Sequence, residues 1–181
     1  MLEFAIIVLP LFTIAAGILE IGLLYRSASL TNSSSRSGAR IASAIWATTA
    51  DASKNSTAVD QIRLTVQTDL STRRPQDTPE KLWIYKAAAN GTPNGSNFSS
   101  CPATTCVQLN WSVATSQFVY ASGTWATEDA CGKVIDTVGV HVKMRHVSLT
   151  KLPFGNAVVD EMTAIRLEPL AFDKCSGEAQ P

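Results

Sequence analysis

The feature that most constrains this chain is an apolar run from Phe4 to Tyr25, in which Glu20 is the only charged residue. As an α-helix this run extends about 33 Å at roughly 1.5 Å per residue, enough to cross the ~30 Å hydrocarbon core of a bilayer. A cleaved secretory signal is a poor alternative, because no Lys or Arg precedes Arg26 and the run is too long for such a signal. A buried core helix is also disfavoured, since a chain this small has little other apolar surface to wrap it. The run predicts a membrane-spanning helix over residues 4–25.

The helix is expected to continue beyond this span, because residues 26–47 contain one glycine and no proline. A narrow stripe recurs there at helical spacing and consists of Leu23, Leu30, Ser34, Ser37, Ile41 and Ile45. Ser, Ala and Gly dominate the rest of the segment, and small residues let helix backbones approach closely. We therefore expect Ser34, Gly38 and Ile41 to contact equivalent helices of other chains. A continuous helix over residues 2–50 would form a rod of about 75 Å.

The remainder, residues 51–181, is predicted to form a separate polar head. One amphipathic helix is expected at 57–70, followed by β-branched and aromatic segments typical of strands at 82–87, 106–111, 117–122, 134–149 and 162–170. Alternation of buried and exposed positions in the fourth strand predicts one buried and one solvated face. A helix packed on an antiparallel sheet satisfies these patterns, so the predicted fold class is α+β.

The cysteines favour an oxidising compartment. Cys101, Cys106, Cys131 and Cys175 form an even set in a loop-rich region, as is common for disulfides. Of the three possible connectivities, we favour Cys101–Cys106 as a local staple and Cys131–Cys175 as a bridge to the C-terminal tail. A zinc site built on the Cys-x4-Cys spacing is disfavoured, because no histidine lies near it.

The expected orientation of the membrane span combines two opposing signals. Arg26, Arg36 and Arg40 follow the span, which by the positive-inside rule would put the polar head in the cytoplasm. The cysteines instead favour an exported head. A short basic leader that once preceded Met1 and has been removed would reconcile both signals.

Motifs of catalysis and cofactor binding are absent from the sequence. It contains no nucleophile elbow, phosphate-binding loop, HExxH or dinucleotide fingerprint. The two histidines, His141 and His146, have opposite parity in one predicted strand, so they should lie on opposite faces, with His141 facing solvent. The formal net charge of zero argues against general nucleic-acid binding. We expect neither an enzyme nor a metal or cofactor protein.

Three segments resemble the TadE-like minor pilins of the tight-adherence branch of type IV pili. The opening LEFAIIVLPLFTIAAGILEIGLLY is similar to that family in its Glu3-Phe4 pair, Pro10 and Glu20-Ile21-Gly22 ending. The RSGAR segment at 36–40 resembles the family's R-x-G-A-R turn of helix. The third similarity is looser. The segments VGVHVKMRHVSL and MTAIRLEP resemble the closing strands of longer members of the family.

The resemblance implies a structural subunit of a surface pilus with an exposed head. Its expected partners are other pilin subunits, a prepilin peptidase, a membrane assembly platform and an ATPase. The chain would be inserted in the cytoplasmic membrane with its head outside before it enters the filament. The alternative is a single-span anchored extracellular binding protein, whose helix never leaves the bilayer.

Three residues in or beside the apolar run are expected to make membrane or subunit contacts, because a carboxylate in an apolar environment is costly unless it is partnered. Glu3 would either pair with the α-amino group of a neighbouring subunit or stabilise its own helix N-terminus. Glu20 is expected to reach outward to the interface, with an inter-subunit contact as the alternative. Pro10 removes one backbone hydrogen bond and favours a local bend.

Overall fold

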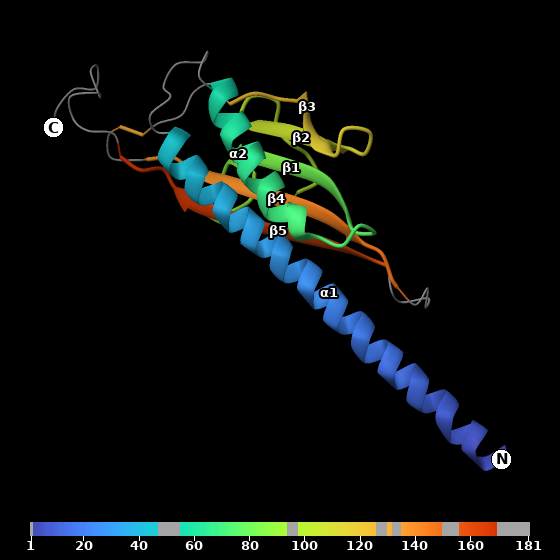
Figure 1. Ribbon diagram of the computed structural model, residues 1–181. Helices are drawn as coiled ribbons and strands as arrows, with labels where there is room; N and C mark the ends of the chain where they lie inside the picture. The colour runs from blue at the N-terminus through green and yellow to red at the C-terminus, as the bar shows by residue number, and fades with distance from the viewer. Residues whose placement is uncertain are drawn as a thin grey trace.

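One long helix carries a small head at its C-terminal half (Figure 1). The computed structural model describes residues 2–46, 55–93, 98–125, 130–131, 135–149 and 156–169. Helix α1 (Leu2–Trp46) has 45 residues and runs through Pro10 without interruption. Its N-terminal half projects away from the head, and its C-terminal half lies across the sheet (Figure 1). The expected continuation of the helix past Tyr25 is thus confirmed as far as Trp46, and residues 47–50 lie outside the described part.

The head is an α+β structure, as the sequence predicts. Helix α2 (Asn55–Asp69) is followed by the short 3-10 helix η1 (Leu70–Thr72). The strands are β1 (Thr78–Lys86), β2 (Cys106–Ser112), β3 (Gln117–Ser122), β4 (Thr137–His146) and β5 (Ala157–Arg166). They form one sheet in the order β3-β2-β1-β4-β5, and every neighbouring pair is antiparallel.

The predicted strands differ from the observed ones mainly at their ends. The third is reproduced at 117–122, whereas the first begins earlier, at Thr78, and the last begins earlier, at Ala157. The fourth ends at His146, where the chain turns toward α1. The start of β5 was missed because its acidic Asp160-Glu161 pair interrupts the apolar pattern, although both residues are register partners of β4.

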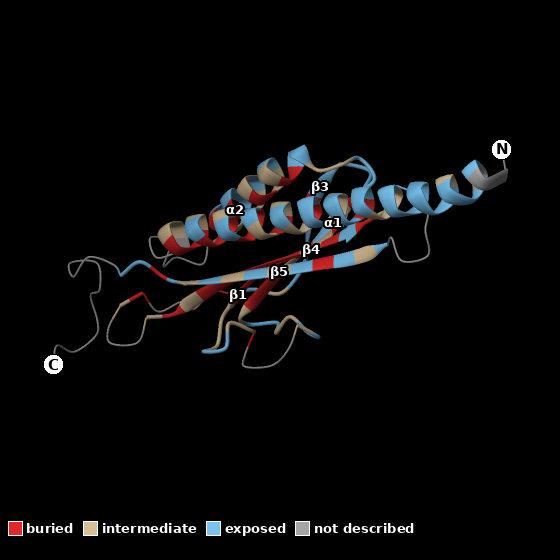
Figure 2. Ribbon diagram, turned by 90° about the horizontal axis from the view of Figure 1, so that it is seen from below, coloured by how far each residue is buried: buried red, intermediate tan, exposed pale blue. Residues whose placement is uncertain are grey.

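The main core lies between the two helices and one face of the sheet. Leu82 and Ile84 of β1 and Val140 and Val142 of β4 point into it, because alternate residues of a strand share a face. Ala39 of α1 is part of the same core. The second half of α1 is therefore a component of the head rather than a rod outside it, and buried residues follow its sheet-facing side in Figure 2.

The opposite face of the sheet carries a second, aromatic cluster. Trp83, Tyr85 and Cys106 are buried there, with Phe98 packed against them. Tyr85 lies so close to Gly139 on β4 that an added Cβ would come within 2.7 Å of its hydroxyl oxygen. Burial raises the pKa of the Tyr85 hydroxyl, which donates a 2.7 Å hydrogen bond to the carbonyl of Gly91. The segment before β2 thus covers this face and protects it from water.

Candidate functional site

The N-terminal half of α1 is an apolar surface that the head does not cover. Large exposed side chains follow it on all sides: Phe4, Ile6, Ile7, Leu9, Leu11, Phe12, Ile14, Ile18, Leu19 and Ile21. Figure 2 shows this half as a mostly exposed helix that extends beyond the sheet. By length and composition, α1 can cross a membrane. Burial of this much apolar surface in lipid or protein is strongly favourable.

Pro10 lies inside this half, and the helix continues through it. Proline removes the N–H that would pair with the carbonyl four residues earlier. One turn later, the Thr13 hydroxyl donates a 2.9 Å hydrogen bond to the carbonyl of Leu9. The side chain of Glu3 lies outside the described part, so its expected partner stays a prediction.

Glu20 joins α1 to the far end of β4. The residue is only 5% exposed, and its Oε1 lies 3.3 Å from Nε2 of His146. The backbone N–H of Leu149 donates to both carboxylate oxygens, at 3.2 and 3.1 Å. A carboxylate in an apolar helix is therefore provided with a basic partner and backbone donors from the head, as burial of a charged group requires.

The other ring nitrogen of His146 faces a second buried carboxylate. Its Nδ1 lies 3.1 Å from Oδ1 of Asp77, in the segment that leads into β1. The Ser27 hydroxyl of α1 donates a 2.7 Å hydrogen bond to Oδ2 of Asp77, and the N–H of Val147 donates to Oδ1. Three parts of the chain thus meet around one imidazole. We call Glu20, Ser27, Asp77 and His146 the junction cluster.

The junction cluster corrects the expectation that Glu20 reaches outward to the membrane interface. Its carboxylate turns toward the head because His146, 126 positions later, offers a partner at the same level of the helix. The prediction that the two histidines occupy opposite faces of β4 holds, since His146 faces α1 and His141 faces the aromatic cluster.

The stripe of small residues on α1 packs against the chain's own head. A Cβ at Gly38 would lie 2.7 Å from Cγ2 of Val66 on α2 and 3.2 Å from Cγ1 of Val140 on β4. Ser34 is fully buried, and Ile41 packs against the core. The expectation that this stripe contacts other chains is therefore corrected. Close approach of backbones does need small residues here, but the partners are α2 and the sheet.

The face of α1 that looks away from the head is polar. It carries Ser29, Ser33, Arg36 and Arg40, all exposed. Their spacing of three and four residues places them on one side of the helix. In the C-terminal half of α1, the head leaves this side of the helix uncovered.

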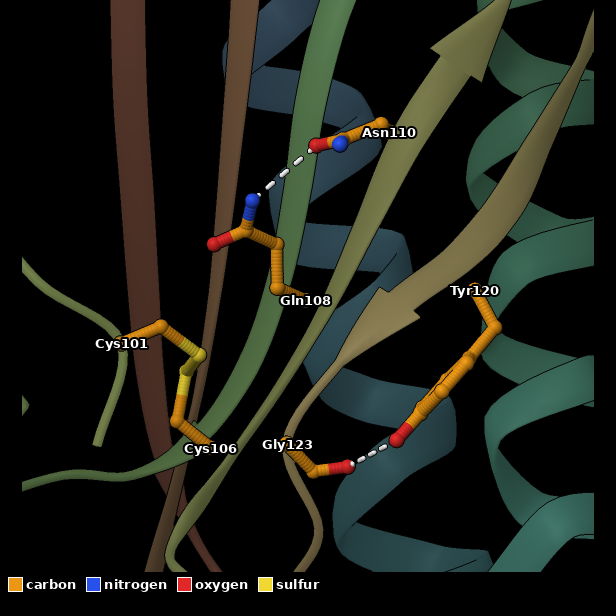
Figure 3. The surroundings of a disulfide bond; sticks show 6 residues. All are labelled: Cys101, Cys106, Gln108, Asn110, Tyr120 and Gly123. Carbon is orange, nitrogen blue, oxygen red and sulfur yellow. Dashed lines mark hydrogen bonds between the residues drawn. A yellow bond between two sulfur atoms is a disulfide. The ribbon is translucent and has the colours of Figure 1, made fainter. Parts of the chain in front are cut away.

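Cys101 and Cys106 form a disulfide, with their Cα atoms 5.4 Å apart. Figure 3 shows that it ties the segment before β2 to the first residue of that strand. Nearby, Gln108 donates to Asn110 along β2, and Tyr120 donates to the carbonyl of Gly123 (Figure 3). Cys131 is also disulfide-bonded. Its expected partner, Cys175, lies outside the described residues.

His141 is buried, which corrects the expectation of a solvent-facing side chain. It is 3% exposed and stacks on Phe98, with ring centroids 4.2 Å apart. Burial lowers the pKa of His141, although its contact with Asp160 opposes the shift. The sequence reasoning missed this because Phe98 arrives from a loop held by the disulfide, and the alternation within β4 contains no sign of it.

The neighbouring basic side chains of β4 are paired as well. Glu80 of β1 lies 3.7 Å from Lys143 and also binds Arg145. Lys143 and Arg145 therefore share one carboxylate partner on the neighbouring strand. Among the described residues, no group of His, Cys, Asp and Glu side chains is arranged to hold a metal ion.

Comparison with known families identifies the segment that contains the exposed helix and its junction with the head. Residues 1–40 match the TadE-like protein family. The match begins before the exposed apolar half and includes Glu20 and Gly38, but it ends before α2 and the sheet. No curated protein and no solved structure matches the chain.

The TadE-like segment is also the part of the chain whose resemblance is most specific in sequence. It combines an uncovered apolar half with a second half that is integrated in the head core. Glu20 is bound by His146 and Leu149, and both of these partners lie beyond the matched range. The sequence does show Glu20 as the one acidic residue of the span, and it contains two histidines. No local pattern, however, indicates that Glu20 pairs with His146.

Proposed function

We propose that the chain is a non-enzymatic structural subunit of a tight-adherence type IV pilus. It acts in filament assembly or priming, or as a building block of the filament with an exposed head for adhesion. The observation that carries this proposal is the apolar half of α1, which is uncovered over residues 4–19 and continues directly into the head. The TadE-like match over residues 1–40 supports the same class.

The uncovered half of α1 suits two successive environments. In the cytoplasmic membrane its side chains are solvated by lipid, and in a filament they are covered by equivalent helices. Gly17 and Gly22 leave open space beside the helix, since an added Cβ would meet nothing within 4 Å. Small residues of this kind let a neighbouring helix approach closely, which stabilises helix pairs by van der Waals contact.

The proposed partners follow from these two environments, the membrane and the filament. Other pilin subunits would cover residues 4–19, while a prepilin peptidase, an assembly platform and an ATPase would process and move the chain. Glu3, two residues from the start of the sequence, is proposed to pair with the α-amino group of a neighbouring subunit. The stabilising contact with its own helix N-terminus is the alternative.

The alternative function is a single-span anchored extracellular binding protein. The small-residue stripe at Ser34 and Gly38 does not separate the two functions, because that stripe packs on the chain's own head. The difference now rests on the uncovered half of α1. An anchor needs only lipid around it, whereas a filament subunit must leave the bilayer.

The test is fractionation of cells that express the chain with an epitope tag in the exposed turn 113–116 between β2 and β3. A subunit should appear in sheared surface fibres as well as in the membrane, at regular positions along each fibre in immunogold images. The matched control is the same tagged chain in cells that lack the assembly ATPase, where only the membrane fraction should contain it. Recovery from the membrane alone in both strains would contradict the proposal and favour the anchored binding protein.

A further inference from the structure

The head contacts α1 at Glu20, before the apolar run ends at Tyr25. Leu149 donates its backbone N–H to Glu20, so the head reaches down to the level of this residue. The part of the apolar helix that precedes Glu20, residues 4–19, extends about 24 Å at roughly 1.5 Å per residue. A bilayer core is about 30 Å thick, so this segment alone is too short to cross it. Either the bilayer thins, or the end of the head that contacts Glu20 enters the lipid interface. We call this the lower end of the head.

The lower end of the head has the surface that an interface requires. Leu149 is 60% exposed although it is apolar, and Tyr25, one turn above Glu20 on α1, is 75% exposed. Tyrosine is enriched at membrane interfaces, where its ring lies among lipid and its hydroxyl meets water. We call Tyr25, Arg26, Arg74 and Leu149 the head base.

The charges at this end are arranged with acids inside and arginines around them. The carboxylates of Glu20 and Asp77 are buried in the junction cluster. Arg26 donates to the carbonyl of Thr72, and Arg74 donates to the carbonyl of Val147, so both guanidinium groups lie at the same end of the head. Lipid phosphates attract such cations near an anionic surface.

We propose that the head base sits in the headgroup layer of a phospholipid bilayer while the chain is in the membrane. Leu149 enters the boundary of the acyl chains, and the exposed Arg26 contacts lipid phosphates. The junction cluster makes this possible, because it removes the Glu20 carboxylate from the lipid. The inference rests on insertion of α1, which the proposed function shares with the anchored alternative. A second copy of the chain is the rival occupant of this surface.

The test is depth-dependent quenching of the full chain in phosphatidylcholine–phosphatidylglycerol nanodiscs that contain one chain each. An environment-sensitive fluorophore is attached at Leu149→Cys, Tyr25→Cys or Phe12→Cys. Leu64→Cys is the matched control, because Leu64 is an exposed leucine on α2. Lipids carry a nitroxide on the headgroup or deep in the acyl chain, and iodide quenches from the aqueous side.

At Leu149 the inference predicts headgroup-nitroxide quenching equal to that at Tyr25, little iodide quenching, and a blue-shifted emission. Leu64 should show the reverse, and Phe12 should respond to the deep nitroxide. Quenching at Leu149 no stronger than at Leu64, with Phe12 still quenched, would overturn the inference and leave the proposed function intact. Protection of Leu149 from iodide without lipid quenching would overturn it as well, since protein would then cover that site. An unquenched Phe12 would overturn insertion and the inference together.

Discussion

The imidazole of His146 lies 3.3 Å from the carboxylate of Glu20 across 126 positions of sequence. This contact fixes where the head sits along α1, because the same carboxylate also accepts the N–H of Leu149. Most described side chains N-terminal to it are exposed, and much of the helix C-terminal to it packs against the head. The position of one acidic residue thus divides the helix into a segment for lipid or other subunits and a segment for the core.

Glu20→Ala should destabilise the head by about 3 kcal/mol, because it leaves a buried imidazole and a backbone N–H without their acceptor. Glu20→Gln keeps an acceptor and should cost less. Denaturant unfolding of the full chain in detergent micelles measures both losses. Ser29→Ala, on the exposed face of the same helix, is the control and should be neutral. A Glu20→Ala variant as stable as the control would mean that the junction cluster does not hold the head in place.

Gly38→Leu should destabilise the head by about 1–3 kcal/mol, as is typical of overpacking in a close-packed core. The added side chain would collide with Val66 and Val140, which approach the Cβ position to 2.7 and 3.2 Å. Gly22→Leu is the matched control, since nothing lies within 4 Å of that position. Thermal unfolding should show a lower midpoint for the first variant only. Equal midpoints for the two variants would contradict the packing of α1 on α2 and β4.

Local patterns accounted for much of the fold, because helix and strand periodicity reflects which side of each element is buried. The solvated face expected for β4 was wrong over residues 138–142, which are all buried between the main core and the aromatic cluster. The helix through Pro10 and the amphipathic α2 were predictable from such patterns. The partner of each buried face was not. The stripe around Gly38 indicated close backbone packing, but a stripe alone does not distinguish α2 and β4 from the helix of another chain.

The same limit explains the errors at the two titratable residues Glu20 and His141. The environment of Glu20 depends on His146, and that of His141 depends on Phe98, which comes from a different part of the chain. Each of these pairs is fixed by tertiary structure rather than by spacing in sequence. The sheet order added to the difficulty, because β1 lies between β2 and β4, which are later in the chain.

Replacement of Cys101 and Cys106 by alanine should lower the free energy of unfolding by about 2 kcal/mol, since the closed loop is short. The described contacts also predict a local effect. Phe98 should lose its fixed contact with His141 and Trp83, and the near-UV circular dichroism of the aromatic cluster should weaken. The far-UV spectrum should stay unchanged. An intact near-UV signal would show that the disulfide is not needed to hold Phe98 over the sheet.

Stability should fall as the pH drops below about 6.5, the ordinary pKa of histidine, because burial lowers the pKa of His141 in the folded chain. Between the two pKa values the unfolded chain binds the extra proton and the folded chain does not. His141→Gln should flatten this part of the profile, as measured by denaturant unfolding between pH 7.5 and 5. A profile with the same slope in the variant would assign the acid sensitivity to other groups.

The central claim is that the uncovered half of α1 packs against other helices in a filament, and the most direct measurement is filament formation by a Gly17→Leu/Gly22→Leu variant. Neither change meets an atom of the chain itself, so folding and membrane insertion should be preserved, with helix propensity raised by under about 1 kcal/mol per site. The added volume would push neighbouring helices apart. At equal protein level, and against an Ile14→Leu/Ile18→Leu control, the account predicts a severe loss of surface filaments. Filaments of normal number and length that contain the glycine variant would contradict it.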